Sequence, residues 1–131
     1  MKRLIECVPN FSEGRDMEVI RQITDAIEAV EGVKLLDVDP GKATNRTVVT
    51  FVGEPEAVVE AAFQGVKKAS EVIDMRYHHG EHPRIGATDV LPLVPVAGVT
   101  LEECAAMART LAERIATELK VPTYCYESAA L

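Results

Sequence analysis

Apolar residues recur at helical spacing in three segments, and each segment begins with a helix-start signal. Asp16 suits the N-cap of the first predicted helix, which is expected to end at Gly32. Pro55 suits the first turn of the second, and Thr100 forms a capping box with Glu103 ahead of the third. The three apolar stripes are Ile20, Ile23, Ile27 and Val30; Val59, Ala62, Phe63, Val66, Ala69 and Ile73; and Cys104, Ala108, Leu111, Ile115 and Leu119.

Short runs rich in β-branched and aliphatic residues lie between these helices and predict strands. The predicted strands cover residues 3–8, 33–38, 47–52, 90–96 and 122–126. The second and third flank a turn-rich segment and are expected to pair as an antiparallel hairpin. Pro9 and Asn10 are expected to form a turn after the first strand. Two prolines in the fourth strand imply an edge position or a late start, because proline has no N–H to donate.

The order strand, helix, strand, strand, helix, strand is the split βαβ pattern. We therefore predict an α/β (α+β) fold, with a ferredoxin-like βαββαβ core extended by a C-terminal helix and strand. Right-handed crossovers would place both core helices on one face of the sheet and leave the other face as a candidate binding surface. At 131 residues with 47% hydrophobic content, the chain is expected to form one domain, residues 1–131.

All three histidines lie between residues 78 and 82, in a segment that also carries Gly80, Pro83 and Gly86 and therefore reads as a polar loop. Pro83 pushes His82 toward an extended conformation, and an imidazole can both take and give a proton near neutral pH. A proton-transfer role and a hydrogen-bonded loop histidine are both consistent with this pattern. A metal site at His78 and His82 would need a helix, which the glycine and proline disfavour, so no metal is expected.

Charge and cysteine content narrow the function classes. The formal charge of −7 disfavours nucleic acid as a partner. No apolar run is long enough to cross a bilayer, and the N-terminus does not resemble a signal peptide, so no membrane association is expected. Cys7, Cys104 and Cys125 are widely spaced in apolar surroundings, which is typical of reduced thiols in a cytoplasmic protein.

Three motifs, Glu6–Gly14, Asn45–Gly53 and Gly80–Asp89, resemble the glutamate formimidoyltransferase family, and the likeness covers essentially the whole chain. The chain resembles the N-terminal subdomain of that family, which implies a ferredoxin-like α/β fold. The resemblance implies transfer of a formimino group between N-formimidoyl-L-glutamate and N5 of tetrahydrofolate, the co-substrate, in histidine degradation. In the family, the histidine of the Gly-Glu-His-Pro-Arg motif is catalytic, and the matching residue is His82.

Five further residues are candidates for substrate binding. Asp39 is a candidate to orient His82 or to hold a cationic amidinium, but a solvated turn aspartate fits the pattern equally well. Arg46 and Arg84 are suited to bidentate pairing with the carboxylates of glutamate or folate, although each alone also reads as a surface charge. Asn10 and Ser12 follow a predicted strand, at a place where α/β sheets often bind ligands, and simple turn chemistry is the alternative.

Length is the departure from the family, whose transferase module has two subdomains with the folate site between them. One hypothesis is therefore an enzyme half that carries the catalytic histidine and transfers formimino groups poorly or not at all by itself. The alternative is a non-catalytic ferredoxin-like domain that binds folate or another small molecule, or a partner protein. The exposed sheet face predicts either a homodimer or a C-terminal subdomain as its cover.

Overall fold

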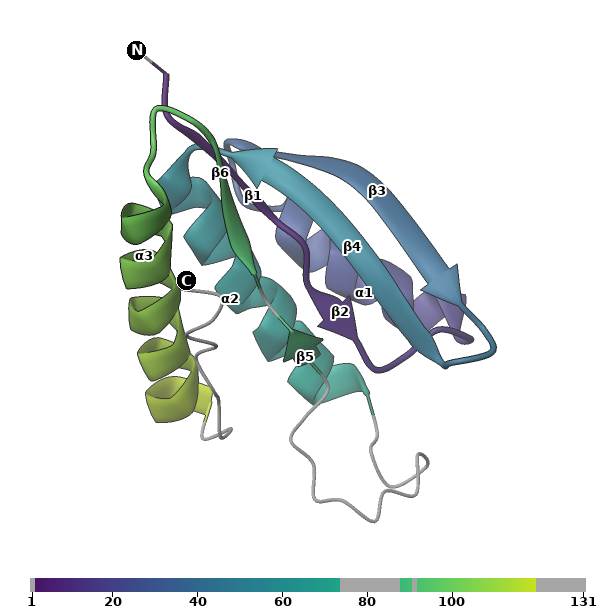
Figure 1. Cartoon of the computed structure of the whole chain (residues 1–131). Coiled ribbons are helices and arrows are strands. Elements are labelled where there is room, and N and C mark those ends of the chain that lie inside the picture. The colour runs from purple at the N-terminus through teal and green to yellow at the C-terminus, as the bar shows by residue number, and fades with distance from the viewer. Residues whose placement is uncertain (1, 74–87, 91, 120–131) are drawn as a thin grey trace.

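The computed structural model describes residues 2–73, 88–90 and 92–119 (Figure 1). Their helices and longer strands follow the order that the apolar pattern predicts. In chain order these elements are β1 (Leu4–Cys7), β2 (Asn10–Phe11), α1 (Met17–Glu28), β3 (Val33–Gly41), β4 (Arg46–Gly53), α2 (Pro55–Val72), β5 (Thr88–Val90), β6 (Leu93–Ala97), α3 (Leu101–Arg114) and a π-helical turn (Ile115–Leu119).

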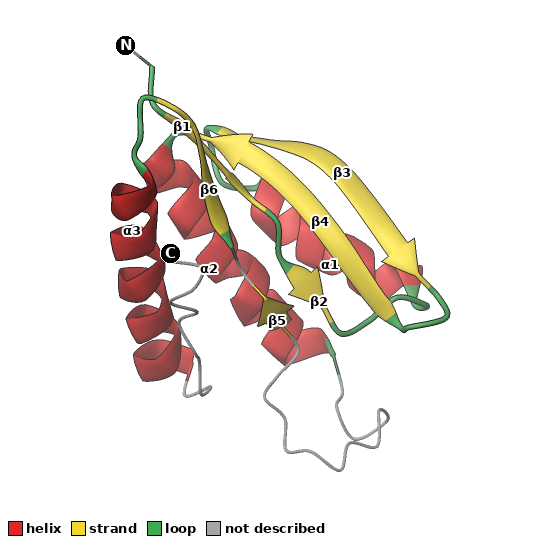
Figure 2. Cartoon of the chain, in the orientation of Figure 1, coloured by secondary structure: helices red, strands yellow, loops and turns green. Residues whose placement is uncertain are grey.

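The strands form one six-stranded antiparallel sheet, shown in yellow in Figure 2. β1 and β2 both pair with β4, one beyond the other along the same side, and β3 pairs with the opposite side of β4. β6 then pairs with β1, and β5 with β2. If β1 with β2, and β6 with β5, are each read as one interrupted strand, the order is that of a ferredoxin-like sheet, which confirms the predicted fold class.

The predicted turn at Pro9-Asn10 is wrong. The Val49 N–H donates to the Pro9 carbonyl at 3.0 Å, so the chain keeps its direction along β4 instead of reversing. Asn10 and Phe11 then pair with Val48 and Thr47 as β2. Proline removes one donor from the ladder but keeps its acceptor, which is why it interrupts this strand without ending it.

The helix-start signals act as predicted. The Asp16 carboxylate accepts from the N–H groups of Glu18 and Val19, and Pro55 occupies the first turn of α2. Thr100 and Glu103 form a complete capping box at the start of α3. Each helix therefore begins where its sequence satisfies or removes the unpaired N–H groups of the first turn.

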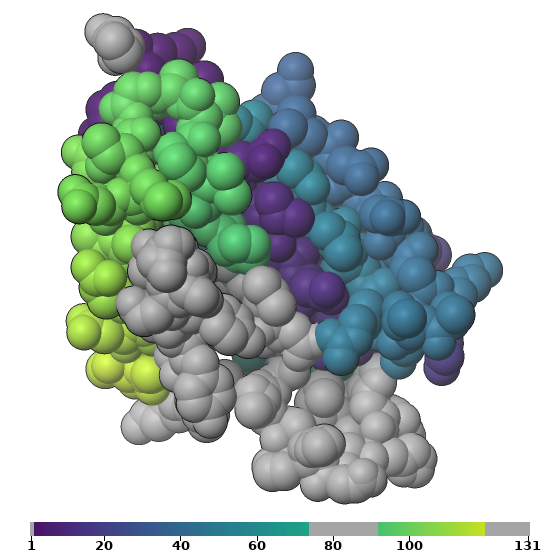
Figure 3. All heavy atoms as spheres, viewed as in Figure 1, coloured from purple at the N-terminus to yellow at the C-terminus, as the bar shows by residue number. Residues whose placement is uncertain are grey.

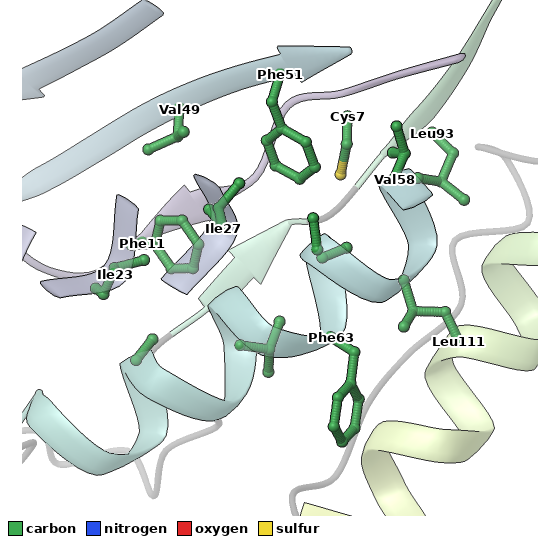
Figure 4. Packing of buried hydrophobic residues seen from close by; sticks show 14 of the residues in the cluster. Cys7, Phe11, Ile23, Ile27, Val49, Phe51, Val58, Phe63, Leu93 and Leu111 are labelled. Carbon is green, nitrogen blue, oxygen red and sulfur yellow. The ribbon is translucent and has the colours of Figure 1, made fainter. Parts of the chain in front are cut away.

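α1 and α2 pack on one face of the sheet and enclose the core (Figures 1 and 4). Phe11, Ile23 and Ile27 meet at one end of it, while Phe63 of α2 and Leu111 of α3 both lie between these two helices. The three predicted helical stripes supply buried residues, as expected of amphipathic helices.

The other face of the sheet, called here the open face, is not covered by any of the described helices. β4 buries every second residue from Thr47 to Gly53, so the residues between them point to the open face. Leu36, Val94 and Val96 on this face are 50%, 41% and 53% exposed. In Figure 3, side chains of β6, β1, β4 and β3 lie side by side at this surface. The prediction that the helices share one face is confirmed.

Candidate active site

The three motifs approach one another at one corner of the sheet. Asn10 and Phe11 of the first motif pair with Val48 and Thr47 of the second. On its other side, Phe11 pairs with Thr88, near the end of the histidine motif. Segments more than 30 residues apart in the chain are therefore neighbours here, at the β2 and β5 strands of Figure 1. The strand pairing of the sheet thus places residues of all three motifs at one corner.

Asn10 and Asp39 lie in one row across the open face. Both are paired with Val48, from opposite sides of β4, and directly opposed residues point to the same face of a sheet. Two neighbouring-strand spacings place their Cα atoms roughly 10 Å apart. Asp39 is exposed and Asn10 is partly buried, so an amide and a carboxylate flank Val48 on this surface.

The side-chain oxygen of Asn10 is sealed from solvent, and no described residue donates a hydrogen bond to it. A buried acceptor without a donor is destabilising and is rare in folded proteins. The position of Asn10 beside the end of the histidine motif therefore makes its amide a candidate for ligand contact.

The loop after β2 is fixed against the turn between β3 and β4. The Gly14 N–H donates to Asn45 Oδ1 at 2.9 Å, and the Thr47 hydroxyl donates to the Glu13 carbonyl at 2.5 Å. Arg15 Nε donates to the Lys42 carbonyl at 2.8 Å. Ser12, which is partly buried, stands at the start of this fixed loop.

Glu13 has a structural role within the loop, because its carboxylate accepts from the N–H groups of Arg15 and Asp16 at 3.0 and 2.8 Å. This is the turn chemistry that is typical of acidic residues just before a helix. Asn45, in contrast, was not among the residues singled out from the sequence. Its φ of 56° is left-handed, a conformation that asparagine tolerates better than most residues. An asparagine in a turn between two predicted strands was the available signal.

Arg46 begins β4 opposite Gly41, and its side chain is exposed. Alternation along β4 puts it on the open face with Val48. His82 and Arg84 lie outside the described residues, and so does the predicted strand 122–126. The structure therefore brings Asn10, Asp39 and Arg46 to one surface, with Ser12 at the start of the adjoining loop.

No catalytic or binding role in the candidate site is assigned to the two described cysteines. Cys7 and Cys104 are buried free thiols, and burial raises the pKa of each. A buried neutral thiol is a poor nucleophile, which agrees with the absence of any role predicted for them.

Within the described ranges no cluster of histidine, cysteine, aspartate or glutamate could hold a metal ion, but all three histidines lie outside those ranges. None of the described helices is long and apolar enough to cross a membrane.

Comparison with known proteins identifies relatives over nearly the whole chain. Residues 4–131 match the family described as the formiminotransferase domain, N-terminal subdomain. The formimidoyltransferase-cyclodeaminase of Rattus norvegicus is 56% identical over 130 residues, which are 99% of this chain and 24% of that protein.

Two shorter relatives are named glutamate formimidoyltransferase. The protein of Thermoplasma acidophilum is 51% identical over 127 residues, which cover 97% of this chain and 42% of that protein. The protein of Streptococcus pyogenes serotype M1 is 48% identical over 130 residues, 99% of this chain and 44% of that protein. The chain thus spans less than half the length of each of these three relatives. It belongs to the formiminotransferase N-terminal subdomain family.

Proposed function

We propose that this chain is the N-terminal half of a glutamate formimidoyltransferase. The reaction moves a formimino group between N-formimidoyl-L-glutamate and N5 of tetrahydrofolate, which acts as co-substrate. Identity of 51% and 48% to two proteins with this name supports the assignment. The observation that carries it is the corner where β2, β4 and β5 bring the three motifs together.

His82 is the proposed catalytic residue. Attack of a nitrogen on the amidine carbon gives a tetrahedral adduct, in which the attacking nitrogen must lose a proton and the departing nitrogen must gain one. One imidazole can perform both transfers, because its ordinary pKa is near neutrality. No metal is required for this chemistry.

The substrate-binding residues proposed with it are Asn10, Ser12, Asp39, Arg46 and Arg84. An amidinium is cationic and carries N–H donors, which suit the Asp39 carboxylate and the Asn10 oxygen on the open face. The arginines suit the carboxylates of glutamate and folate.

Because the described part of the open face carries exposed apolar residues, we propose that a second subdomain or a second copy covers it. Cytoplasmic location is proposed from the reduced thiols alone.

The test is the substitution His82→Ala in a transferase that contains this chain together with the second half found in longer relatives. Turnover should fall by roughly 100-fold or more, the usual effect of losing a general acid or base. His79→Ala is the matched control, since it removes a neighbouring imidazole with no proposed role. Near-normal turnover in His82→Ala would refute the proton-transfer role.

The alternative function is a non-catalytic domain that binds folate or another small molecule. It predicts that tetrahydrofolate still binds, but that no formimino transfer occurs even when a second half is supplied. Measuring tetrahydrofolate binding and a single turnover with N-formimidoylglutamate on the same preparation separates the two functions.

A further inference from the structure

One side chain connects two motifs that are far apart in the sequence, through a hydrogen bond between Asn45 and Gly14 that is called here the Asn45–Gly14 lock. Asn45 Oδ1 accepts the Gly14 N–H at 2.9 Å across a separation of 31 residues. Asn45 is in the turn between β3 and β4, whereas Gly14 is in the loop that follows β2. This contact is the only side-chain cap on the Gly14 N–H within the described part of the chain.

The lock requires special residues on both sides. Asn45 has a φ of 56°, a left-handed conformation that most side chains disfavour. On the other side, a Cβ built on Gly14 would lie 2.5 Å from the Arg46 nitrogen, the Arg46 oxygen and the Gly41 oxygen. The backbones therefore approach as closely as only a glycine permits.

Neighbouring contacts show what the lock holds in place. The Thr47 hydroxyl donates to the Glu13 carbonyl, and Arg15 Nε donates to the Lys42 carbonyl. The loop held by these contacts begins at Ser12, directly after β2. The hairpin on the other side contains Asp39, near the end of β3, and Arg46, the first residue of β4. Side chains proposed to bind one substrate thus come from two segments whose relative position these contacts define.

We propose that Asn45 is a positioning residue for the transferase reaction, setting the loop that begins at Ser12 against the hairpin of Asp39 and Arg46. The inference rests on the proposed function. Asn45 does not itself touch substrate in this arrangement. Its effect is on substrate binding, because a site assembled from two segments loses affinity when their spacing is no longer fixed.

Three substitutions separate its two properties. Asn45→Asp keeps a side-chain acceptor and tolerates the left-handed conformation. Asn45→Gly keeps the conformation but loses the acceptor, and Asn45→Ala loses both. Thr44→Ala is the matched control, because Thr44 Oγ1 donates only to the Gly41 carbonyl inside the same turn, at 3.3 Å.

The kinetic measurement uses an active transferase that contains this chain, assayed well below its unfolding temperature. Asn45→Gly and Asn45→Ala are expected to raise KM by roughly tenfold, the effect of losing one hydrogen bond that fixes the site. kcat should change less, and Asn45→Asp should restore KM to near the original value. Unchanged KM in Asn45→Gly, or an equal rise in Thr44→Ala, would overturn the proposal.

A second measurement does not depend on activity. Hydrogen exchange at the Gly14 amide of the 131-residue chain should be faster in Asn45→Gly and slow again in Asn45→Asp. If the unsubstituted transferase that contains both halves proves inactive while this exchange pattern holds, the proposed function fails, but the structural role of the Asn45–Gly14 contact stands. If exchange at Gly14 is the same in all variants, the lock itself is refuted.

Discussion

Gly14 is the residue whose identity the packing constrains most tightly around the candidate site. Its Cα lies so close to the β3–β4 turn that an added methyl group would meet three backbone atoms at 2.5 Å. Backbone atoms cannot rotate away as a flexible side chain can, so the loop as a whole would have to shift. A position of this kind links a single residue type to the geometry of the site.

We expect Gly14→Ala to destabilise the chain by about 1–3 kcal/mol, the usual range for forcing extra volume into a packed region. Gly41→Ala is the control, because its Cβ would first meet the end of the Thr44 side chain at 3.0 Å. Urea unfolding of both variants measures the difference. Equal, small losses in the two variants would contradict the close packing at Gly14.

At the scale of elements, Arg114 of α3 contacts two side chains of α2. Arg114 Nη1 lies 2.8 Å from Glu60 Oε1, and its guanidinium carbon lies 3.6 Å from the centre of the Phe63 ring. Gln64 Nε2 also donates to Glu60, at 2.8 Å. The hydrogen bond from Arg114, followed by that from Gln64, lowers the pKa of the Glu60 carboxyl. These contacts hold the C-terminal end of α3 against α2.

A carboxyl whose pKa is lower in the folded state contributes stability above its unfolded pKa of about 4.3, and this is lost as pH falls through the folded value. Glu60 is 41% exposed, so solvent screening limits its contribution to about 1 kcal/mol or less. Glu60→Gln should therefore destabilise the chain at pH 7 but much less at pH 3, as measured by urea unfolding at both values.

The control for this prediction is Glu56→Gln, which removes a carboxylate on the same helix that is 82% exposed and 3.8 Å from Arg3. It should have little effect at either pH, because exposed, long ion pairs contribute almost nothing. A difference between Glu60→Gln and the unsubstituted chain that is the same at pH 7 and pH 3 would exclude the ion pair as its cause.

At the scale of the whole molecule, we expect the 131-residue chain to fold when expressed alone but to transfer formimino groups poorly. Folding follows from the core that α1, α2 and the sheet enclose. Weak transfer follows because relatives named glutamate formimidoyltransferase are more than twice as long, and a site built from two halves loses one wall when one is missing.

The charge of −7 points the same way, since an anionic folate needs cations that this half does not supply in excess. Exposed Leu36, Val94 and Val96 on the open face also predict self-association. An activity assay with N-formimidoylglutamate and tetrahydrofolate, together with the mass in solution, tests these expectations. Full activity from a monomer would show that the chain is a complete site.

The sequence by itself determined the order of elements, the starts of the three helices and the antiparallel hairpin. These depend on local signals: Asp16 and Thr100 satisfy N–H groups within their own helices, and apolar spacing of three and four defines each buried face. Local information also suggested His82 as the catalytic residue, because the cluster of histidines and the proline that follows it can be recognised in the sequence before the fold is known.

Only the tertiary structure decided which polar residues share a surface. Asn10 and Asp39 become neighbours because both pair with Val48, a register that depends on strand pairing between distant segments. The expected turn at Pro9 was wrong for the same reason, since the Val49 N–H that keeps the strand going is 40 residues away in the chain. Contacts between segments, such as that of Asn45 with Gly14, depend on packing that no local pattern encodes.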